Sequence, residues 1–381
     1  MANKKVVHMV EDLRIGGLER VIASIVLGLD TTRYGVEVWC LARGGDIAEE
    51  LANRGVTVKI LGMNTYHNPL QIIALSRLIR RSRIDIIHTH GYFGSTFGRL
   101  AALLGKTPTI IAHVHTTYYG FKRRNLLIER FLSLFTDRIV CISQAVKRFV
   151  VEVEGISEKK TALIYNGVGG PRLFEGDSDS GVDRRSLGLG ETDLVVITVA
   201  SLTPHKGHVV LIDAAQVVSK THENVRLLIV GDGPLRNKLE AYVEDLQLSS
   251  KVVFAGQRKD IGHLLNLADL CVLPSTEREG LGIALIEALA EGLPVIGAML
   301  GGIPEVIEDN VNGLLVAPGS SRELAAALEK MIRGKGIREK MGRMGRQIYE
   351  QRFTVTKMNQ RIEALYDGTS MRRSVDAFAA L

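Results

Sequence analysis

Cysteine, proline and aromatic residues are scarce in this sequence of 381 residues. Its three cysteines (Cys40, Cys141 and Cys271) stand far apart with no Cys-x-x-Cys pair, so we expect neither disulfide bonds nor a structural zinc site. Aromatic residues make up 5% of the chain and are not interleaved with basic ones, which argues against nucleic-acid binding. No run of 18 apolar residues occurs, and the apolar run 6–10 is too short for a signal peptide. We therefore expect a cytoplasmic protein without a membrane-spanning helix.

The remaining composition is that of a globular protein, with 46% hydrophobic and 24% charged residues. The length predicts two domains, at roughly 100–200 residues each. The net charge of +6 is unevenly distributed: residues 1–170 contain 23 basic and 14 acidic residues, and residues 171–381 contain 25 and 28. A basic first half and a mildly acidic second half indicate different partners for the two halves.

Short β-branched runs alternate with amphipathic windows along the chain. This pattern predicts parallel sheets covered by helices, an α/β fold of two Rossmann-like, doubly wound domains facing a central cleft. We expect an N-terminal domain at 1–170, a Gly-, Asp- and Ser-rich linker at 171–193, and a second domain at 194–350. A C-terminal helix at 351–381 is expected to return toward the first domain and to fray beyond Gly368. The predicted strands are 5–10, 36–41, 56–61, 85–90, 109–114, 138–142, 161–165, 194–200, 225–231, 252–255, 270–274, 294–298 and 313–316.

Two motifs place glycine at a predicted helix start just after a strand. Gly16 and Gly17 follow the first strand, where a bare helix N-terminus offers N–H groups and positive potential to an anion. No Gly-x-Gly-x-x-Gly fingerprint occurs there, which weakens an NAD-binding interpretation. Lys206 and Gly207 occupy the equivalent place in the second half, where a lysine can hold a phosphate. A plain turn and a solvated lysine are the alternatives.

The segment 279–287 is the most informative. Glu279 precedes Gly280, Leu281 and Gly282, and Glu287 lies in the helix that follows. Two carboxylates flanking an anion-binding helix start fit a nucleotide-sugar, with hydroxyls bound at each end and the diphosphate between them. The alternative is two carboxylates placed by the helix dipole, but Glu287 in an apolar helix would be costly without a partner.

In this order and spacing, the motifs resemble those of the GT-B glycosyltransferases, in particular the retaining family 4 group, over about residues 4–366. The resemblance rests on six motifs. They are Gly16–Gly17, Asn166–Gly167–Val168, Lys206–Gly207, Gly231–Asp232–Gly233–Pro234, Glu279 with Glu287, and Gly301–Gly302–Ile303–Pro304–Glu305.

The resemblance implies a role for each matching residue. Glu287 would bind the donor ribose, Glu279 the transferred sugar, and Lys206 the diphosphate. Backbone near Arg258 would contact the base, and Gly16 and Gly17 would approach the donor phosphate or the acceptor. His115 matches the histidine of the first domain near the donor sugar, and we place His113 on the opposite face of the sheet.

One position departs from the family pattern. Ser201 stands where many members have arginine, so the diphosphate charge would rest on Lys206 and the helix N-termini. The implied reaction is retaining, metal-independent transfer with no cofactor, from a UDP-sugar in preference to a GDP-sugar. The one Asp-x-Asp, Asp177–Ser178–Asp179, lies in the predicted linker and is interpreted as solvated.

Basic residues of the first half suggest the acceptor. Arg77, Arg80, Arg81 and Arg83 cluster at the end of one helix, and residues 122–124 precede the apolar helix 125–135. Such a cluster suits an anionic membrane surface or a lipid-linked glycan acceptor in cell-envelope polysaccharide synthesis, at the inner face of a membrane. An ordinary solvated face over a core helix is the alternative. A sugar-nucleotide epimerase, or a catalytically weakened sugar-nucleotide-binding protein, also fits the motifs.

Overall fold

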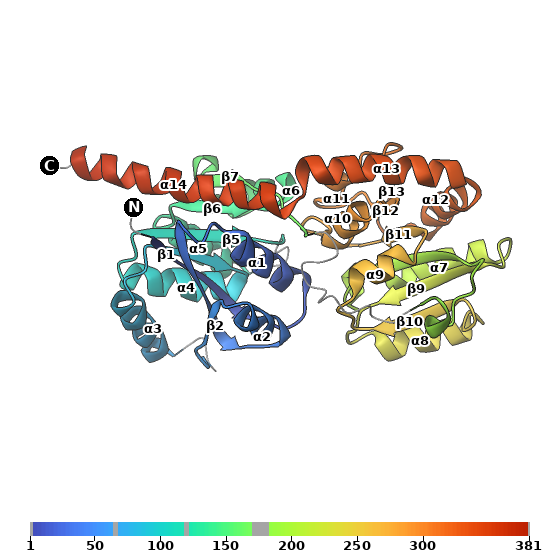
Figure 1. Cartoon of the computed structure of the whole chain (residues 1–381), viewed down its shortest axis with the longest axis horizontal. Coiled ribbons are helices and arrows are strands. Elements are labelled where there is room, and N and C mark those ends of the chain that lie inside the picture. Colours follow the sequence, from blue (N-terminus) through green and yellow to red (C-terminus); the bar gives the residue numbers. More distant parts are fainter. Residues whose placement is uncertain (1–2, 64–67, 118–121, 170–182, 380–381) are drawn as a thin grey trace. The chain divides into compact units, whose positions relative to one another are not determined.

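The computed structural model describes residues 3–63, 68–117, 122–169 and 183–379, with side chains as far as Thr369. The chain divides into two units. Figure 1 shows their helices and strands, coloured along the sequence and labelled as in the text. The first unit comprises Met1–Gly167 and Val355–Leu381, and the second comprises Val168–Thr354. The predicted α/β class with two Rossmann-like sheets is confirmed.

The first unit contains a parallel sheet of seven strands among its described residues, in the order β3-β2-β1-β4-β5-β6-β7. Its central strands are β-branched runs buried on both faces, as a parallel sheet between helices requires. The strands are β1 Lys4–Asp12, β2 Tyr34–Arg43, β3 Thr57–Ile60, β4 Ile86–His90, β5 Thr109–Val114, β6 Arg138–Cys141 and β7 Thr161–Leu163. The helices are α1 Gly17–Gly28, α2 Asp46–Asn53, α3 Pro69–Arg81, α4 Tyr92–Leu104, α5 Arg123–Ser133, α6 Gln144–Arg148, with short turns Phe149–Val153 and Glu158–Lys160, and α14 Val355–Ala379.

The second unit repeats this plan with six described strands, in the order β10-β9-β8-β11-β12-β13. The strands are β8 Leu194–Val199, β9 Val225–Val230, β10 Val252–Gly256, β11 Leu270–Leu273, β12 Val295–Ala298 and β13 Gly313–Val316. The helices are α7 His208–Ser219, α8 Arg236–Asp245, α9 Ile261–Asn266, α10 Ile283–Ala290, α11 Ile303–Val306, α12 Ser321–Arg333 and α13 Lys335–Arg352, with 3-10 turns at Arg185–Leu187 and Pro204–Lys206.

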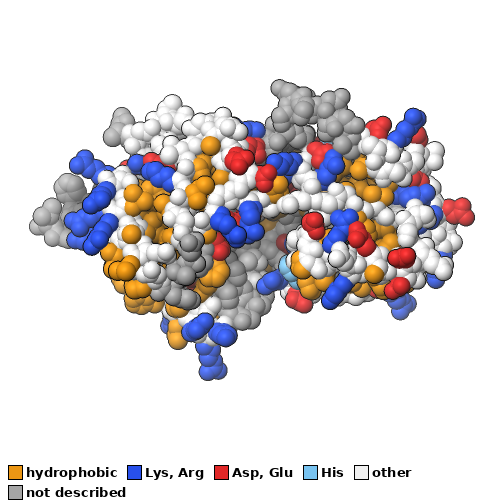
Figure 2. Space-filling view, turned by 90° about the horizontal axis from the view of Figure 1, so that it is seen from below, with side chains coloured by type: hydrophobic (Ala, Val, Ile, Leu, Met, Phe, Trp, Pro, Cys, Tyr) orange, Lys and Arg blue, Asp and Glu red, His pale blue; other side chains and the backbone are white. Residues whose placement is uncertain are grey.

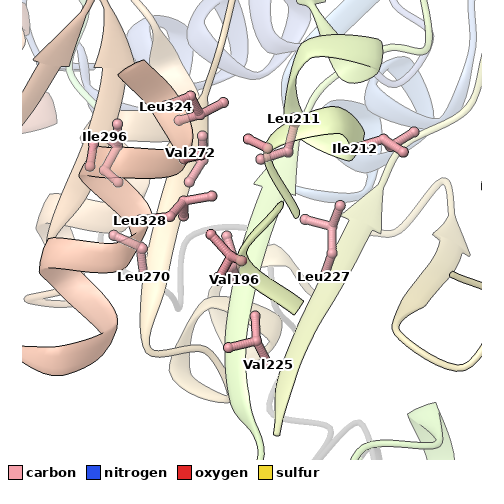
Figure 3. Close-up of a cluster of buried hydrophobic side chains, with 14 of the residues drawn as sticks. Val196, Leu211, Ile212, Val225, Leu227, Leu270, Val272, Ile296, Leu324 and Leu328 are labelled. Atoms are coloured by element: carbon pink, nitrogen blue, oxygen red, sulfur yellow. The ribbon is translucent and has the colours of Figure 1, made fainter. Parts of the chain in front are cut away.

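The core of the second unit lies between this sheet and two helices. Figure 3 shows Val196, Leu227 and Leu270 of the strands pointing toward helices α7 and α12. Leu211 of α7 and Leu328 of α12 pack against them and are almost completely buried. Complete burial of such side chains contributes about 2 kcal/mol each, so this core fixes the strand ends that carry the site.

Two predicted boundaries differ from the structure. Residues 183–193 belong to the second unit instead of a linker, because Arg184 donates hydrogen bonds to the carbonyls of Asp193 (2.8 Å) and Leu267 (2.9 Å). The expected linker residues 171–182 lie outside the described residues. The returning segment begins at Val355, packs on α1, and stays helical beyond Gly368, where Thr369 Oγ1 donates to the carbonyl of Leu365.

Candidate active site

Loops at the carboxyl edge of the second sheet carry most of the residues expected to bind a donor. All its strands are parallel, so β8, β9, β11 and β12 end at one edge, where α/β sheets bind ligands. Ser201 follows β8, Gly231 follows β9, and residues 274–282 follow β11. Thr276 N donates to His205 O (2.9 Å), which ties the loop after β11 to the loop after β8.

Lys206 and Glu279 form an ion pair at this edge. Lys206 Nζ lies 2.6 Å from Glu279 Oε2, and both side chains are largely buried. Ser275 Oγ donates to the same carboxylate oxygen at 2.9 Å. The approach depends on Gly207, whose φ is +72° and where an added Cβ would lie 2.0 Å from the carbonyl oxygen of Pro274. Any other residue would push the lysine loop away from β11.

The glycine-rich loop before α10 packs backbone to backbone against a second glycine pair. A Cβ on Gly301 would lie 2.0 Å from Glu279 O, and a Cβ on Gly302 would lie 2.2 Å from Gly280 O. Gly302 N donates to Glu279 O at 3.2 Å. Gly282, with φ +89°, is the N-cap of α10 and offers no side-chain cap. The N-terminus of α10 therefore lies beside the ion pair with its positive end at the edge.

Leu281 and Glu287, on either side of this helix start, differ in burial. Leu281 is buried, whereas Glu287 is half-buried on the next turn of α10. Burial, and then the charge of Glu287, raise the pKa of the Cys271 thiol on β11. The carboxylate of Glu287 therefore lies within electrostatic range of Cys271.

Ser201 lies on the same loop after β8 as Lys206, and Arg258 lies on the loop after β10. Ser201 is exposed, and its hydroxyl lies 3.3 Å from Thr203 Oγ1. Arg258 donates two hydrogen bonds to Asp260, at 2.8 and 2.6 Å, and this pairing holds the pKa of Asp260 below its usual range. The side chain of Arg258 thus fixes its own loop, which is consistent with an expected role for backbone there.

In the first unit, Gly16 lies against the carboxyl group of half-buried Glu19. Gly16 is extended, with φ −169°, and Gly17 begins α1. A Cβ on Gly16 would lie 2.1 Å from Glu19 Oε2, so the side chain of Glu19 folds back over the glycine. Burial raises the pKa of Glu19 to about 7. Sequence reasoning gave Glu19 no role, although an acidic residue in the turn after two glycines was its signal.

His115 lies at the end of β5, but the placement of His113 on the opposite face was wrong. The two rings stack with centroids 4.1 Å apart, because residues two apart in a strand share a face. They belong to a group of five histidines with His8 of β1 and His88 and His90 of β4. Neighbouring strands pair His8 with His88 and His90 with His113, which brings all five rings together.

These histidines are buried and neutral. His8, His88, His90 and His113 are at most 1% exposed, and His115 is half-buried. Burial lowers the pKa of His8 and of His115 to about 3 and those of the other three well below the usual value. The sequence signal was His-x-His twice, in residues 88–90 and 113–115, within otherwise apolar strands.

Comparison with known proteins identifies the class. Residues 15–169 match the family described as Glycosyltransferase Family 4, and residues 179–348 match Glycosyl transferases group 1. The chain therefore belongs to the family 4 glycosyltransferases with the GT-B fold.

Individual relatives agree with this assignment. The chain is 27% identical to an Escherichia coli UDP-Gal:alpha-D-GlcNAc-diphosphoundecaprenol alpha-1,3-galactosyltransferase, covering 77% of this chain and 78% of that one. It is 24% identical to the N-acetyl-alpha-D-glucosaminyl L-malate synthase of Bacillus anthracis, covering 77% of each. Crystal structures of Anabaena HepE, one with UDP and glucose and one with UDP-glucose, superpose with TM-scores of 0.84 and 0.83. Their identities are 25% and 26%, and both cover 96% of this chain and at least 99% of theirs.

Proposed function

We propose that this protein is a retaining, metal-independent glycosyltransferase that uses a UDP-sugar. The Lys206–Glu279 pair beside the N-terminus of α10 carries the proposal. A lysine ammonium has three donors, so it can keep Glu279 and still bind a phosphate oxygen. HepE bound to UDP-glucose supports UDP as the nucleotide.

In the proposed reaction, negative charge grows on the diphosphate as the glycosidic bond breaks. Lys206 and the N-terminus of α10 would stabilise that charge, since fixed positive groups aimed at a developing anion lower the barrier most effectively. Glu287 would bind the ribose and backbone near Arg258 the base. Glu279 would hold hydroxyls of the transferred sugar, with Ser201 near the phosphates. No covalent sugar–enzyme intermediate and no cofactor are part of the proposal.

His115, Gly16 and Gly17 are proposed to act from the first unit. Neutral His115 can exchange hydrogen bonds with sugar hydroxyls without adding charge. Gly16 and Gly17 would let the acceptor or the donor phosphate approach the backbone at the start of α1.

The donor site can be tested by ligand-induced stabilisation. UDP, GDP, ADP and NAD are compared in thermal unfolding, and a ligand at a hundredfold excess over its Kd stabilises by about 2.7 kcal/mol. We expect UDP to give the largest shift and Lys206→Ala to reduce it. Lys238→Ala, an exposed lysine on α8, is the matched control and should leave the shift unchanged. A shift with NAD alone, or with no nucleotide, would refute the proposed donor.

Turnover separates the proposed transfer from its alternatives. UDP-sugar is incubated with an acceptor, and UDP release and the sugar product are measured. Release of UDP that requires Glu279 supports transfer. Conversion of the UDP-sugar to another sugar-nucleotide without UDP release indicates an epimerase. Binding without either product indicates the weakened binding protein that Ser201 suggests.

We propose a lipid-linked acceptor at an anionic membrane surface. Helix α5 carries Leu127 and Phe131, and Leu134 follows at its end; they are 65%, 55% and 66% exposed. Lys122 and residues 123–124 lie at its start. Apolar side chains flanked by basic ones suit the interface of an anionic bilayer. The E. coli relative, named for a diphosphoundecaprenol-linked substrate, supports the same acceptor class.

Figure 2 shows further hydrophobic side chains on one face of the first unit (left), with Lys and Arg around them. Within the part of the chain that the structure describes, no helix combines the length and apolar character needed to span a bilayer. The contact that we propose is peripheral, made by exposed side chains of α5 with the cytoplasmic face of a membrane.

Sedimentation with liposomes tests this acceptor surface. We expect the protein to pellet with vesicles containing phosphatidylglycerol and to stay in the supernatant with phosphatidylcholine alone. The double variant Leu127→Ser and Phe131→Ser should lose most of the pelleted fraction. Val217→Ser, which changes a similarly exposed valine of the second unit, is the control. An equal pelleted fraction of the wild-type protein with both kinds of vesicle would refute the membrane proposal.

A further inference from the structure

Four of the five buried histidines and one tyrosine form a single hydrogen-bonded chain. His115 Nε2 lies 3.1 Å from His90 Nδ1, and His90 Nε2 lies 2.9 Å from His8 Nδ1. His8 Nε2 lies 3.3 Å from the hydroxyl of Tyr366, which lies 2.7 Å from His88 Nδ1. The chain runs from the carboxyl edge of the sheet to α14.

The rings along this chain meet end to end. The centroids of His8 and His90 are 5.2 Å apart with planes 18° apart, and those of His90 and His115 are 5.4 Å apart. Two imidazole rings have these centroid separations when a nitrogen of one ring points at a nitrogen of the other, nearly in the plane of both rings. Each shared contact is therefore a directed N–H···N hydrogen bond between rings.

A neutral imidazole has one donor and one acceptor nitrogen, so the tautomer of one ring sets that of the next. Burial keeps all these rings neutral by lowering their pKa values. The hydrogen-bonded chain of rings therefore has two arrangements. In one, every N–H donates toward Tyr366, and in the other, every N–H donates toward His115. The hydrogen bonds of Tyr366, at one end, decide between them.

Tyr366 distinguishes the two arrangements by the lengths of its two hydrogen bonds. Hydrogen bonds donated by O–H are shorter than those donated by N–H, so the 2.7 Å distance to His88 Nδ1 favours donation by the hydroxyl there, and the 3.3 Å distance to His8 Nε2 favours acceptance from His8 Nε2–H. His8 Nδ1 then accepts from His90 Nε2–H, and His90 Nδ1 accepts from His115 Nε2–H. The last atom, His115 Nδ1, is then a lone-pair acceptor that is buried and has no partner among the described residues, so a substrate hydroxyl must displace whatever covers it.

We propose that Tyr366, His8 and His90 form a positioning relay that holds His115 in its Nε2–H tautomer and directs the Nδ1 lone pair at a substrate hydroxyl. This inference rests on the proposed role of His115 in glycosyl transfer. Tyr366, His8 and His90 are completely buried and act only through His115. The relay accounts for an otherwise costly burial of polar rings inside an apolar sheet.

The alternative interpretation of these histidines is a metal site. Two groups of three have ligand atoms within 4.8 Å of one another, namely His8, His88 and His90, and His90, His113 and His115. Ring geometry opposes it. His113 and His115 are stacked 4.1 Å apart with planes at 26°, so their in-plane lone pairs cannot meet at one ion. His8 and His90 point at each other at 2.9 Å, closer than the roughly 3.3 Å between ligands of a tetrahedral site with bonds of about 2 Å.

Nuclear magnetic resonance of ¹⁵N-histidine-labelled protein tests the relay directly. At pH 7.5 we expect His115 of the wild type in a single Nε2–H tautomer, assigned by loss of its signals in His115→Gln. Tyr366→Phe keeps the ring and removes the hydroxyl, and should convert His115 to a mixture of tautomers. Tyr34→Phe is the matched control, because Tyr34 packs edge-on against Tyr366 and bonds to Asp367. It should leave the tautomers unchanged.

Kinetics provide the second readout. Tyr366→Phe should lower kcat about 3- to 10-fold and leave KM for the UDP-sugar within twofold, whereas Tyr34→Phe should change neither. A wild-type His115 in the Nδ1–H form, or an unchanged tautomer in Tyr366→Phe, would overturn the relay. A normal kcat in Tyr366→Phe together with mixed tautomers of His115 would also overturn it. Binding of one equivalent of Zn²⁺ to the wild type with loss of the ring N–H signals would do the same. Absence of any sugar transfer by the wild type would instead refute the proposed function.

Discussion

Mild acid should destabilise the first unit, because four of its histidines are fully buried. An unfolded histidine takes up a proton near pH 6.5, whereas burial keeps the pKa of His8 at about 3 and those of His88, His90 and His113 well below 6.5. The unfolded unit therefore binds more protons than the folded one below pH 6.5, and the free energy of unfolding falls as the pH falls. Between pH 6.5 and pH 5.0 each histidine removes about 1.6 kcal/mol.

Two buried carboxyl groups act with the opposite sign. Burial raises the pKa of Glu19 to about 7 and that of Glu154 to about 8, so both are protonated in the folded unit at pH 5 to 6.5 and lose the proton on unfolding. They offset about 4 of the roughly 8 kcal/mol from the histidines over this range, since half-buried His115, whose pKa is also about 3, adds about 1.6 kcal/mol to the loss from the four fully buried rings. The net expected loss is about 4–5 kcal/mol, a large fraction of the 5–15 kcal/mol typical of a folded domain.

Tryptophan fluorescence isolates this effect, because Trp39 is the single tryptophan of the chain and is buried on β2 of the first unit. Urea unfolding is followed at pH 6.5 and 5.0. In His113→Leu, which removes a ring with no hydrogen-bond partner among the described residues, the acid loss should shrink by about a third. His222→Leu, in the second unit, should leave it unchanged. Equal stability of the wild type at both pH values would refute the reasoning.

Three further changes follow from the second unit. Glu279→Gln keeps the shape of a side chain proposed to bind the transferred sugar, and should lower kcat about 100-fold in a UDP-release assay; an unchanged kcat would remove Glu279 from the site. Ser201→Arg adds a guanidinium beside the proposed phosphate site, and should tighten UDP binding about 5- to 10-fold by calorimetry; no gain would contradict that placement. Gly207→Ala, with its Cβ 2.0 Å from Pro274 O, should cost at least about 3 kcal/mol and lower Tm by roughly 6–12 °C. Gly188→Ala has a similar φ of +70° but open space, so it should lose only about 1 kcal/mol.

The sheets were predictable from the sequence because most of their strands are short β-branched runs, and the central ones are buried on both faces. Each of the 13 expected strands overlaps a strand of the structure, and α7 and α10 begin one residue after the predicted helix starts at Gly207 and Gly282. Glycine at those positions marks the turn between a strand and the following helix, so the local sequence pattern agrees with the fold.

What the sequence could not provide is long-range pairing. Arg184 donates to the carbonyl of Leu267, 83 residues away, so residues that look like a linker belong to the second unit. Tyr366 meets His8 across 358 residues, and nothing in either local sequence indicates that contact. The Lys206–Glu279 distance likewise depends on how closely Gly207 approaches Pro274. In each case the partner was set by tertiary packing.

The error at His113 shows how the signal should be interpreted. Periodicity alone places His113 and His115 on one face of β5, and His88 and His90 on one face of β4, whose register then brings His90 beside His113. A polar ring buried without a partner is expensive, and a strand made of valine and isoleucine would be more stable there. Five imidazoles on one face of a parallel sheet, four of them fully buried and with both ring nitrogens of His113 unpartnered among the described residues, therefore conflict with the requirements of folding alone. The conflict is resolved if the rings serve the chemistry at that edge, and the tautomer of His115 is the property through which they can do so.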